Sequence, residues 1–91
     1  MAINKIMCCC GSGLGSSMLV RLNVESVLKE LGFSGIEVIH TSVSDATPGA
    51  ADLFVVGSDL QEFTKGLSNV VTLDNIIDKN ELREKLKEKL V

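Results

Sequence analysis

The residues with the clearest capacity for chemistry are three consecutive cysteines followed by a glycine-rich segment. The candidate segment comprises Cys10, Gly11, Ser12, Gly13, Leu14, Gly15, Ser16 and Ser17. Its glycines allow backbone conformations in which successive N–H groups converge on an anion, and a helix that starts directly afterwards would add its N-terminal field. The sequence therefore predicts a phosphate-binding loop whose first residue is a cysteine.

Cys10 is the cysteine that we expect to react. The amides of the loop would stabilise its thiolate, and a thiolate held among such donors can attack phosphorus and retain the phosphoryl group. The alternative is that Cys10 packs as a small apolar side chain at the end of a strand. Cys8 and Cys9 lie inside an apolar run, so we expect them to point to opposite faces of a strand and to pack in the core.

Several known motifs are excluded by single residues. No lysine follows Gly15, as a nucleotide-binding P-loop requires, and Ser16 stands where a dinucleotide fingerprint has its third glycine. Only His40 could assist the adjacent cysteines at a zinc ion, so we expect no metal and no cofactor. In a tyrosine phosphatase of low molecular weight, an arginine stands six residues after the cysteine. In this sequence the residue six positions after Cys10 is Ser16. Without that guanidinium, relay of a phosphoryl group is favoured over hydrolysis.

Composition limits the classes of protein that fit. The 91 residues suit one domain spanning 1–91, and 45% hydrophobic with 23% charged residues is typical of a globular protein. Only 3% of residues are aromatic and the net charge is -3, which argues against a nucleic-acid partner. There is no apolar run of about 20 residues and no secretory signal at the N-terminus, so we expect a cytoplasmic protein that does not insert into a membrane.

Strand and helix patterns alternate along the chain. Apolar and β-branched runs predict strands at 3–9, 36–40, 53–56 and 69–73. Helical spacing predicts helices at 17–31, 59–66 and 78–90, with a short helical turn within 41–51. Gly32 is placed to take the left-handed conformation after the first helix. This order predicts an α/β fold, a four-stranded parallel open sheet in the order 2-1-3-4 with helices on both faces, similar to the architecture of low-molecular-weight tyrosine phosphatases.

Three further polar residues lie near the same edge of the predicted sheet. Asp59 could hold the loop backbone or orient a partner, although capping of the next helix by Ser58 or Asp59 is the simpler interpretation. His40 is expected to be a surface or partner-contact residue, since relay to a thiolate needs no base. Arg21 could meet an acidic partner or be a solvated helix residue.

The loop and the order of elements resemble the IIB component of the sugar phosphotransferase system. The sequence Cys10-Gly-Ser-Gly-Leu-Gly-Ser-Ser-Met18 is similar to the loop of the lactose/ascorbate/galactitol-type group, most of all to the ascorbate branch. The resemblance extends over the whole chain, through the helix that ends before Gly32 and the amphipathic last helix.

The resemblance implies a phosphotransferase with a phosphocysteine intermediate at Cys10. A IIA protein that carries phosphohistidine would donate the phosphoryl group, and the membrane IIC permease would present an ascorbate- or galactitol-like sugar as the acceptor. Two alternatives stay open: a phosphatase-like enzyme on the same scaffold, and a non-catalytic regulatory module that retains the fold.

Overall fold

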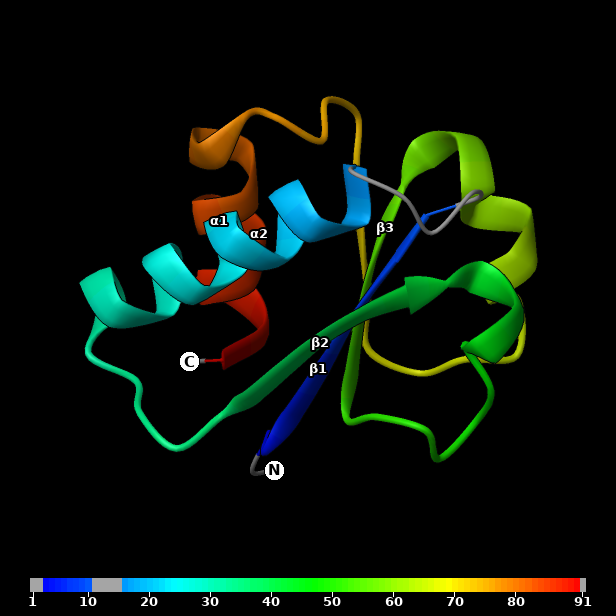
Figure 1. Ribbon diagram of the computed structural model, residues 1–91, viewed down its shortest axis with the longest axis horizontal. Helices are drawn as coiled ribbons and strands as arrows, with labels where there is room; N and C mark the ends of the chain where they lie inside the picture. Colours follow the sequence, from blue (N-terminus) through cyan, green and yellow to red (C-terminus); the bar gives the residue numbers. More distant parts are fainter. Residues whose placement is uncertain (1–2, 11–15, 91) are drawn as a thin grey trace.

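Strands and helices alternate along the chain in the computed structural model (Figure 1). It describes residues 3–10 and 16–90, with the backbone alone at positions 10, 16, 17 and 43. The elements in these residues are β1 (Lys5–Cys10), α1 (Ser16–Leu31), β2 (Glu37–Ser42), the 3-10 helix η1 (Val43–Asp45), β3 (Leu53–Gly57), the 3-10 helix η2 (Ser58–Thr64), β4 (Val70–Leu73) and α2 (Lys79–Leu90).

The four strands form one parallel sheet in the order β2-β1-β3-β4. β1 lies between β2 and β3, and in the register Cys8 is the Cα partner of His40 on one side and of Val55 on the other. Because all strands run the same way, their carboxyl ends meet at one edge of the sheet. The predicted α/β class and the strand order 2-1-3-4 are confirmed.

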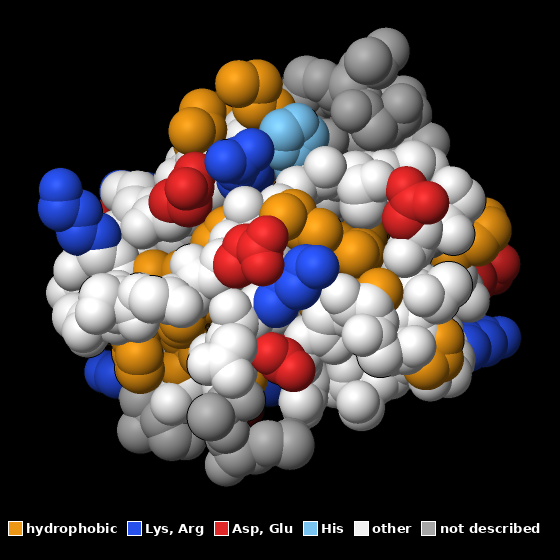
Figure 2. Space-filling model, turned by 60° about the horizontal axis from the view of Figure 1, so that its bottom comes forward, with side chains coloured by type: hydrophobic (Ala, Val, Ile, Leu, Met, Phe, Trp, Pro, Cys, Tyr) orange, Lys and Arg blue, Asp and Glu red, His pale blue; other side chains and the backbone are white. Residues whose placement is uncertain are grey.

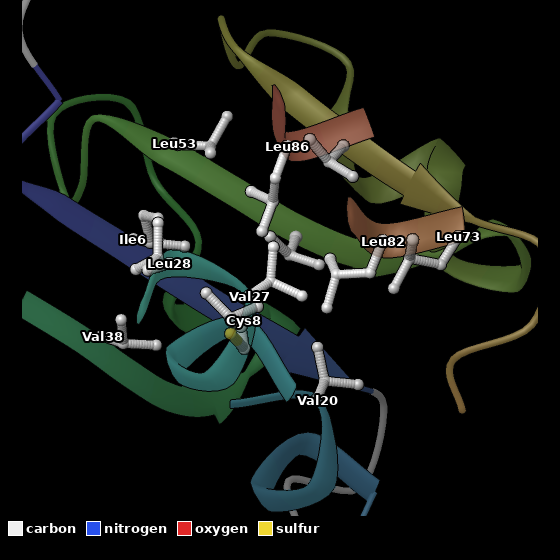
Figure 3. Close-up of a cluster of buried hydrophobic side chains, with 13 residues drawn as sticks. Ile6, Cys8, Val20, Val27, Leu28, Val38, Leu53, Leu73, Leu82 and Leu86 are labelled. Carbon is white, nitrogen blue, oxygen red and sulfur yellow. The ribbon is translucent and has the colours of Figure 1, made fainter. Parts of the chain in front are cut away.

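The two faces of the sheet are covered differently. α1 and α2 pack next to each other on one face, above the larger core cluster (Figures 1 and 3). That cluster contains Ile6, Cys8, Val20, Val24, Val27, Leu28, Val38, Leu53, Val55, Val71, Leu73, Leu82 and Leu86. The opposite face is covered by the segments that contain η1 and η2, over the buried side chains of Met7, Cys9, Phe54 and Val56. Helices thus lie on both faces as predicted, but those on the second face are short 3-10 helices.

Local signals set the helix ends. Gly32 has φ of 84° and donates its N–H to the Lys29 carbonyl at 3.2 Å, and the Phe33 N–H reaches the Leu28 carbonyl at 2.9 Å. This pair of bonds closes α1 as predicted. α2 starts one residue later than expected, because the Asp78 carboxylate caps the helix by accepting the N–H groups of Asn80 and Glu81 at 3.0 and 3.2 Å.

The carboxylate of Glu81 ties α2 to the end of β4. It accepts the backbone N–H groups of Asp74 and Asn75 at 2.9 and 3.0 Å and pairs with Lys85 Nζ at 3.0 Å. Lys85 also donates to the carbonyl of Thr72. These bonds, first of all the one from the Asp74 N–H, lower the pKa of Glu81 to about 2.

Glu81→Gln is expected to lower the free energy of unfolding at neutral pH by about 1 kcal/mol, because a carboxylate accepts hydrogen bonds more strongly than an amide. The pKa is lowered in the folded state, so the stabilisation is complete above the ordinary value of 4.5 and declines as the pH falls toward about 2. Urea unfolding of both proteins at several pH values measures this. Glu84→Gln, an exposed position on the same helix with the same charge change, is the control. Equal stability of the Glu81 and Glu84 variants at neutral pH would contradict the assignment.

Candidate active site

The backbone brings the candidate cysteine and the start of α1 to the same region of the fold. Cys10 is the last residue of the central strand β1, and its Cα partner in β2 is Ser42, which is also the last residue of its strand. α1 begins at Ser16, only six residues further along the chain. In an open parallel sheet, this carboxyl edge beside the central strand is where ligands bind.

Most of the predicted phosphate-binding loop cannot be compared with the structure. Gly11, Ser12, Gly13, Leu14 and Gly15 lie outside the described residues. For Cys10, Ser16 and Ser17 the structure describes the backbone alone. The predicted converging amides therefore stay a prediction.

Cys8 and Cys9 are core residues on opposite faces of the sheet, as predicted. Cys8 is 0% exposed among the aliphatic side chains under α1 (Figure 3), and Cys9 is 3% exposed in the cluster on the other face. Burial, reinforced by Cys9 and Glu25 and opposed by Arg21, raises the pKa of Cys8 to about 12. The Cys8 thiol is therefore neutral at physiological pH and is not a nucleophile.

Arg21 and His40 form a contact that the sequence did not predict. Arg21 Nη1 lies 3.2 Å from His40 Nδ1, and Arg21 Nε lies 3.6 Å from Glu25 Oε1 on the next turn of α1. A guanidinium has no acceptor, so it donates to Nδ1, and the proton of a neutral His40 then sits on Nε2. The two residues are 19 positions apart. They meet because α1 packs against β2. A contact of this kind cannot be predicted from the pattern of neighbouring residues along the chain.

A small hydroxyl and carboxylate network joins the end of β2 to η1. Ser42 Oγ is 3.0 Å from Ser44 Oγ, and Thr41 Oγ1 donates to Asp45 Oδ2 at 2.5 Å. Since Ser42 is the register partner of Cys10, this network lies beside the end of the central strand. The polar run directly after an apolar strand was the signal that could have drawn attention to it.

The predicted cap of η2 is wrong. The N-cap residue is Gly57, and no side chain forms a capping hydrogen bond. Instead, the Asp59 carboxylate folds back over Gly57, where a Cβ would meet Asp59 Oδ1 at 2.6 Å and Ile76 Cγ2 at 3.3 Å. A side chain at position 57 would therefore require the Asp59 carboxylate to move away and Ile76 to shift slightly, whereas the backbone of Gly57 has an ordinary extended conformation.

Comparisons with known proteins agree with this geometry. Residues 5–88 match the family model described as "PTS system, Lactose/Cellobiose specific IIB subunit". The chain is also similar to a protein of Mycoplasma pneumoniae described as "Ascorbate-specific PTS system EIIB component", with 31% identity over 84 residues that cover 89% of this chain and 88% of that protein.

The chain belongs to the IIB family of the sugar phosphotransferase system, as the sequence indicated. It is a phosphoryl-transfer component of such a system. Members of this family work together with IIA and IIC components. Within residues 3–10 and 16–90, no helix has the length and apolar character needed to cross a membrane.

The raised pKa of Cys8 predicts how stability changes at high pH. The unfolded thiol ionises near 9.0 and the folded one near 12, so the stabilisation is complete below pH 9 and is lost as the pH rises between these values. Relative to Cys8→Ala, the wild-type free energy of unfolding should fall by about 1.4 kcal/mol per pH unit above pH 9. Urea unfolding of both proteins between about pH 8 and 10.5 tests this. Parallel pH profiles would show that Cys8 ionises as easily folded as unfolded.

Proposed function

We propose that this protein relays a phosphoryl group through Cys10, from the phosphohistidine of a IIA protein to a sugar bound by a membrane IIC permease. The observation that carries the choice of residue is the burial of the other two cysteines. Cys8 and Cys9 are 0% and 3% exposed within the core, whereas the backbone of Cys10 ends the strand at the ligand-binding edge of the sheet. Membership of the IIB family supports the relay itself.

Each transfer exchanges one bond to phosphorus for another. The Cys10 thiolate attacks the phosphorus of phosphohistidine, the P–N bond breaks as the S–P bond forms, and the histidine nitrogen leaves with the electron pair. A sugar hydroxyl then attacks the same phosphorus, the S–P bond breaks, and the thiolate is restored while the hydroxyl proton passes to solvent or a base of the permease. No metal or cofactor takes part in either step of this proposal.

Residues 11–17 have a defined role in the proposal. Their amides and the start of α1 would hold the equatorial oxygens of the phosphoryl group, which carry most of the charge during transfer. The same donors would favour the thiolate form of Cys10 before and after transfer. One set of groups would thus support acceptance and release.

The proposed substrate and compartment are chosen with the relative and the family as a guide. The similar protein of Mycoplasma pneumoniae is named as ascorbate-specific, so an ascorbate-like sugar acid is the first acceptor to test and galactitol the second. A IIA donor and the inner surface of a permease both require a cytoplasmic location for this domain.

Cys10→Ser is expected to abolish acceptance of phosphate from a purified ascorbate-type IIA protein carrying radiolabelled phosphohistidine. Cys8→Ala and Cys9→Ala are the matched controls, because each removes a neighbouring sulfur without burying an unpaired hydroxyl. We expect wild-type labelling of both controls once the folded fraction is taken into account, and a loss of at least a hundred-fold in the Cys10 variant.

Labelling of Cys10→Ser at the wild-type level would defeat the proposal. Turnover of an aryl phosphate by the wild-type protein, without any IIA partner, would favour the phosphatase alternative instead.

A further inference from the structure

The outer strand β2 brings a hydroxyl group to the end of the central strand. Ser42 is the last residue of β2, and its Cα partner in β1 is Cys10. Paired strands lie about 4.8 Å apart, so Ser42 is the direct neighbour of the Cys10 backbone on this side. On the other side, β3 reaches the same edge with Val56 and Gly57, whose side chains carry no polar atoms. The polar side chain that the neighbouring strands supply at this position is therefore that of Ser42.

The side chain of Ser42 belongs to the face of the sheet that α1 covers. Side chains alternate between the faces along a strand, and Val38 is buried in the core cluster under α1. Two residues later, His40 contacts Arg21 of α1, and Figure 2 shows the only histidine of the chain (pale blue) beside a cationic side chain (blue) at the surface. Ser42 follows after two more residues, so alternation places its partly exposed hydroxyl on the same face.

The hydroxyl of Ser42 has a proton to donate. Its Oγ accepts the Ser44 N–H at 3.3 Å and lies 3.0 Å from Ser44 Oγ. A serine hydroxyl has one donor and two acceptor positions. When the Ser44 hydroxyl donates to Ser42 Oγ, both acceptor positions are filled, and the Ser42 proton is available to a further acceptor. Asp45, the one carboxylate within residues 41–47, has its own donor in Thr41 Oγ1 at 2.5 Å.

We propose that Ser42 is a second side chain of the active site, whose hydroxyl donates a hydrogen bond to the thiolate of Cys10. The inference rests on the proposed function, and it adds a side-chain donor to the backbone amides of residues 11–17. A hydrogen bond to an ionised acceptor is roughly twice as strong as one between neutral groups, so this bond favours the thiolate over the thiol. Ser42 thus helps to keep Cys10 ionised and ready to attack phosphorus at neutral pH.

The charged and titratable side chains that α1, β2 and η1 place around Ser42 are Arg21, Glu25, His40 and Asp45. Arg21 lies 3.2 Å from His40 Nδ1 and 3.6 Å from Glu25 Oε1, so its positive charge is balanced by a carboxylate of its own helix. Asp45 opposes the ionisation of a neighbouring thiol. The contribution of Ser42 is separate from this balance, because a serine hydroxyl carries no charge.

A purely local role is the alternative for the same contacts. A serine that accepts the N–H two residues later forms a common turn, and in that role the Ser42–Ser44 pair only joins β2 to η1. The two roles differ in what they require of Ser44. If the pair only closes the turn, removal of either hydroxyl has a similar effect. If Ser42 serves Cys10, removal of the Ser42 hydroxyl alone changes the ionisation of the cysteine.

The test measures the ionisation midpoint of Cys10 in folded variants, by alkylation with iodoacetamide across pH and mass spectrometry of each cysteine. Ser42→Ala should raise the midpoint by about one pH unit. Ser44→Ala and Ser42→Thr should keep the wild-type midpoint, because both retain a hydroxyl at position 42. Ser42→Val has the shape of Ser42→Thr without the hydroxyl, so it repeats the comparison in a second pair. Circular dichroism and urea unfolding establish that each variant is folded.

Phosphoryl acceptance gives a second readout. At pH 7, transfer from a phosphorylated ascorbate-type IIA protein to Ser42→Ala should be up to about ten-fold slower, with an unchanged KM for the donor. The wild-type and variant rates should converge near pH 9.5, where the thiolate predominates in both proteins.

An unchanged Cys10 midpoint in folded Ser42→Ala overturns the inference, as does an equal shift in Ser44→Ala or the same midpoint in Ser42→Val and Ser42→Thr. A slower transfer without a shifted midpoint also overturns it. In each case a wild-type protein that accepts phosphate on Cys10 leaves the proposed function intact. If the wild-type protein accepts no phosphate from the IIA donor, the proposed function itself has failed, whatever the midpoints.

Discussion

The position of β1 at the centre of the sheet is the constraint on which the rest of the structure depends. β1 is hydrogen-bonded on both edges, to β2 and β3, and buried on both faces from Ile6 to Cys9. Burial in this strand holds the Cys8 thiol in its neutral form, since it raises the pKa of that thiol to about 12. This is why we propose Cys10, where the strand ends, as the residue that carries the phosphoryl group.

The second helix holds α1 against the sheet beside that strand. Glu30 of α1 pairs with Lys79 and Arg83 of α2 at 3.1 and 2.9 Å, and these partners lower the pKa of Glu30. Each exposed pair contributes little alone, but the buried leucines of α2 hold the same two helices together. Because both α-helices lie on one face, α1 is fixed between β2 and α2. Its first residue, Ser16, comes six positions after Cys10, the last residue of β1.

The sequence was sufficient for the class of fold and insufficient for contacts between elements. Alternating apolar runs and Gly32 predicted the strand order and the end of α1, because those signals are local and the chirality of crossovers limits the topology. The pairing of Arg21 with His40 depends on how α1 packs over β2, which no spacing encodes. The cap by Ser58 or Asp59 was predicted from residue type alone, but Gly57 is the N-cap residue and the Asp59 carboxylate lies over it without capping the helix. The phosphate-binding loop itself stays a prediction from the glycine pattern and the family.

The most direct test of the account is the ionisation of Cys10 in the wild-type protein. The rate of alkylation by iodoacetamide, followed for each cysteine by mass spectrometry across pH, reports the thiolate fraction at that position. The account predicts a midpoint for Cys10 at least one unit below the ordinary value of about 8.5, and no modification of Cys8 in the folded protein. A Cys10 midpoint at or above about 8.5 would contradict the claim that this strand end stabilises a phosphoryl-accepting thiolate.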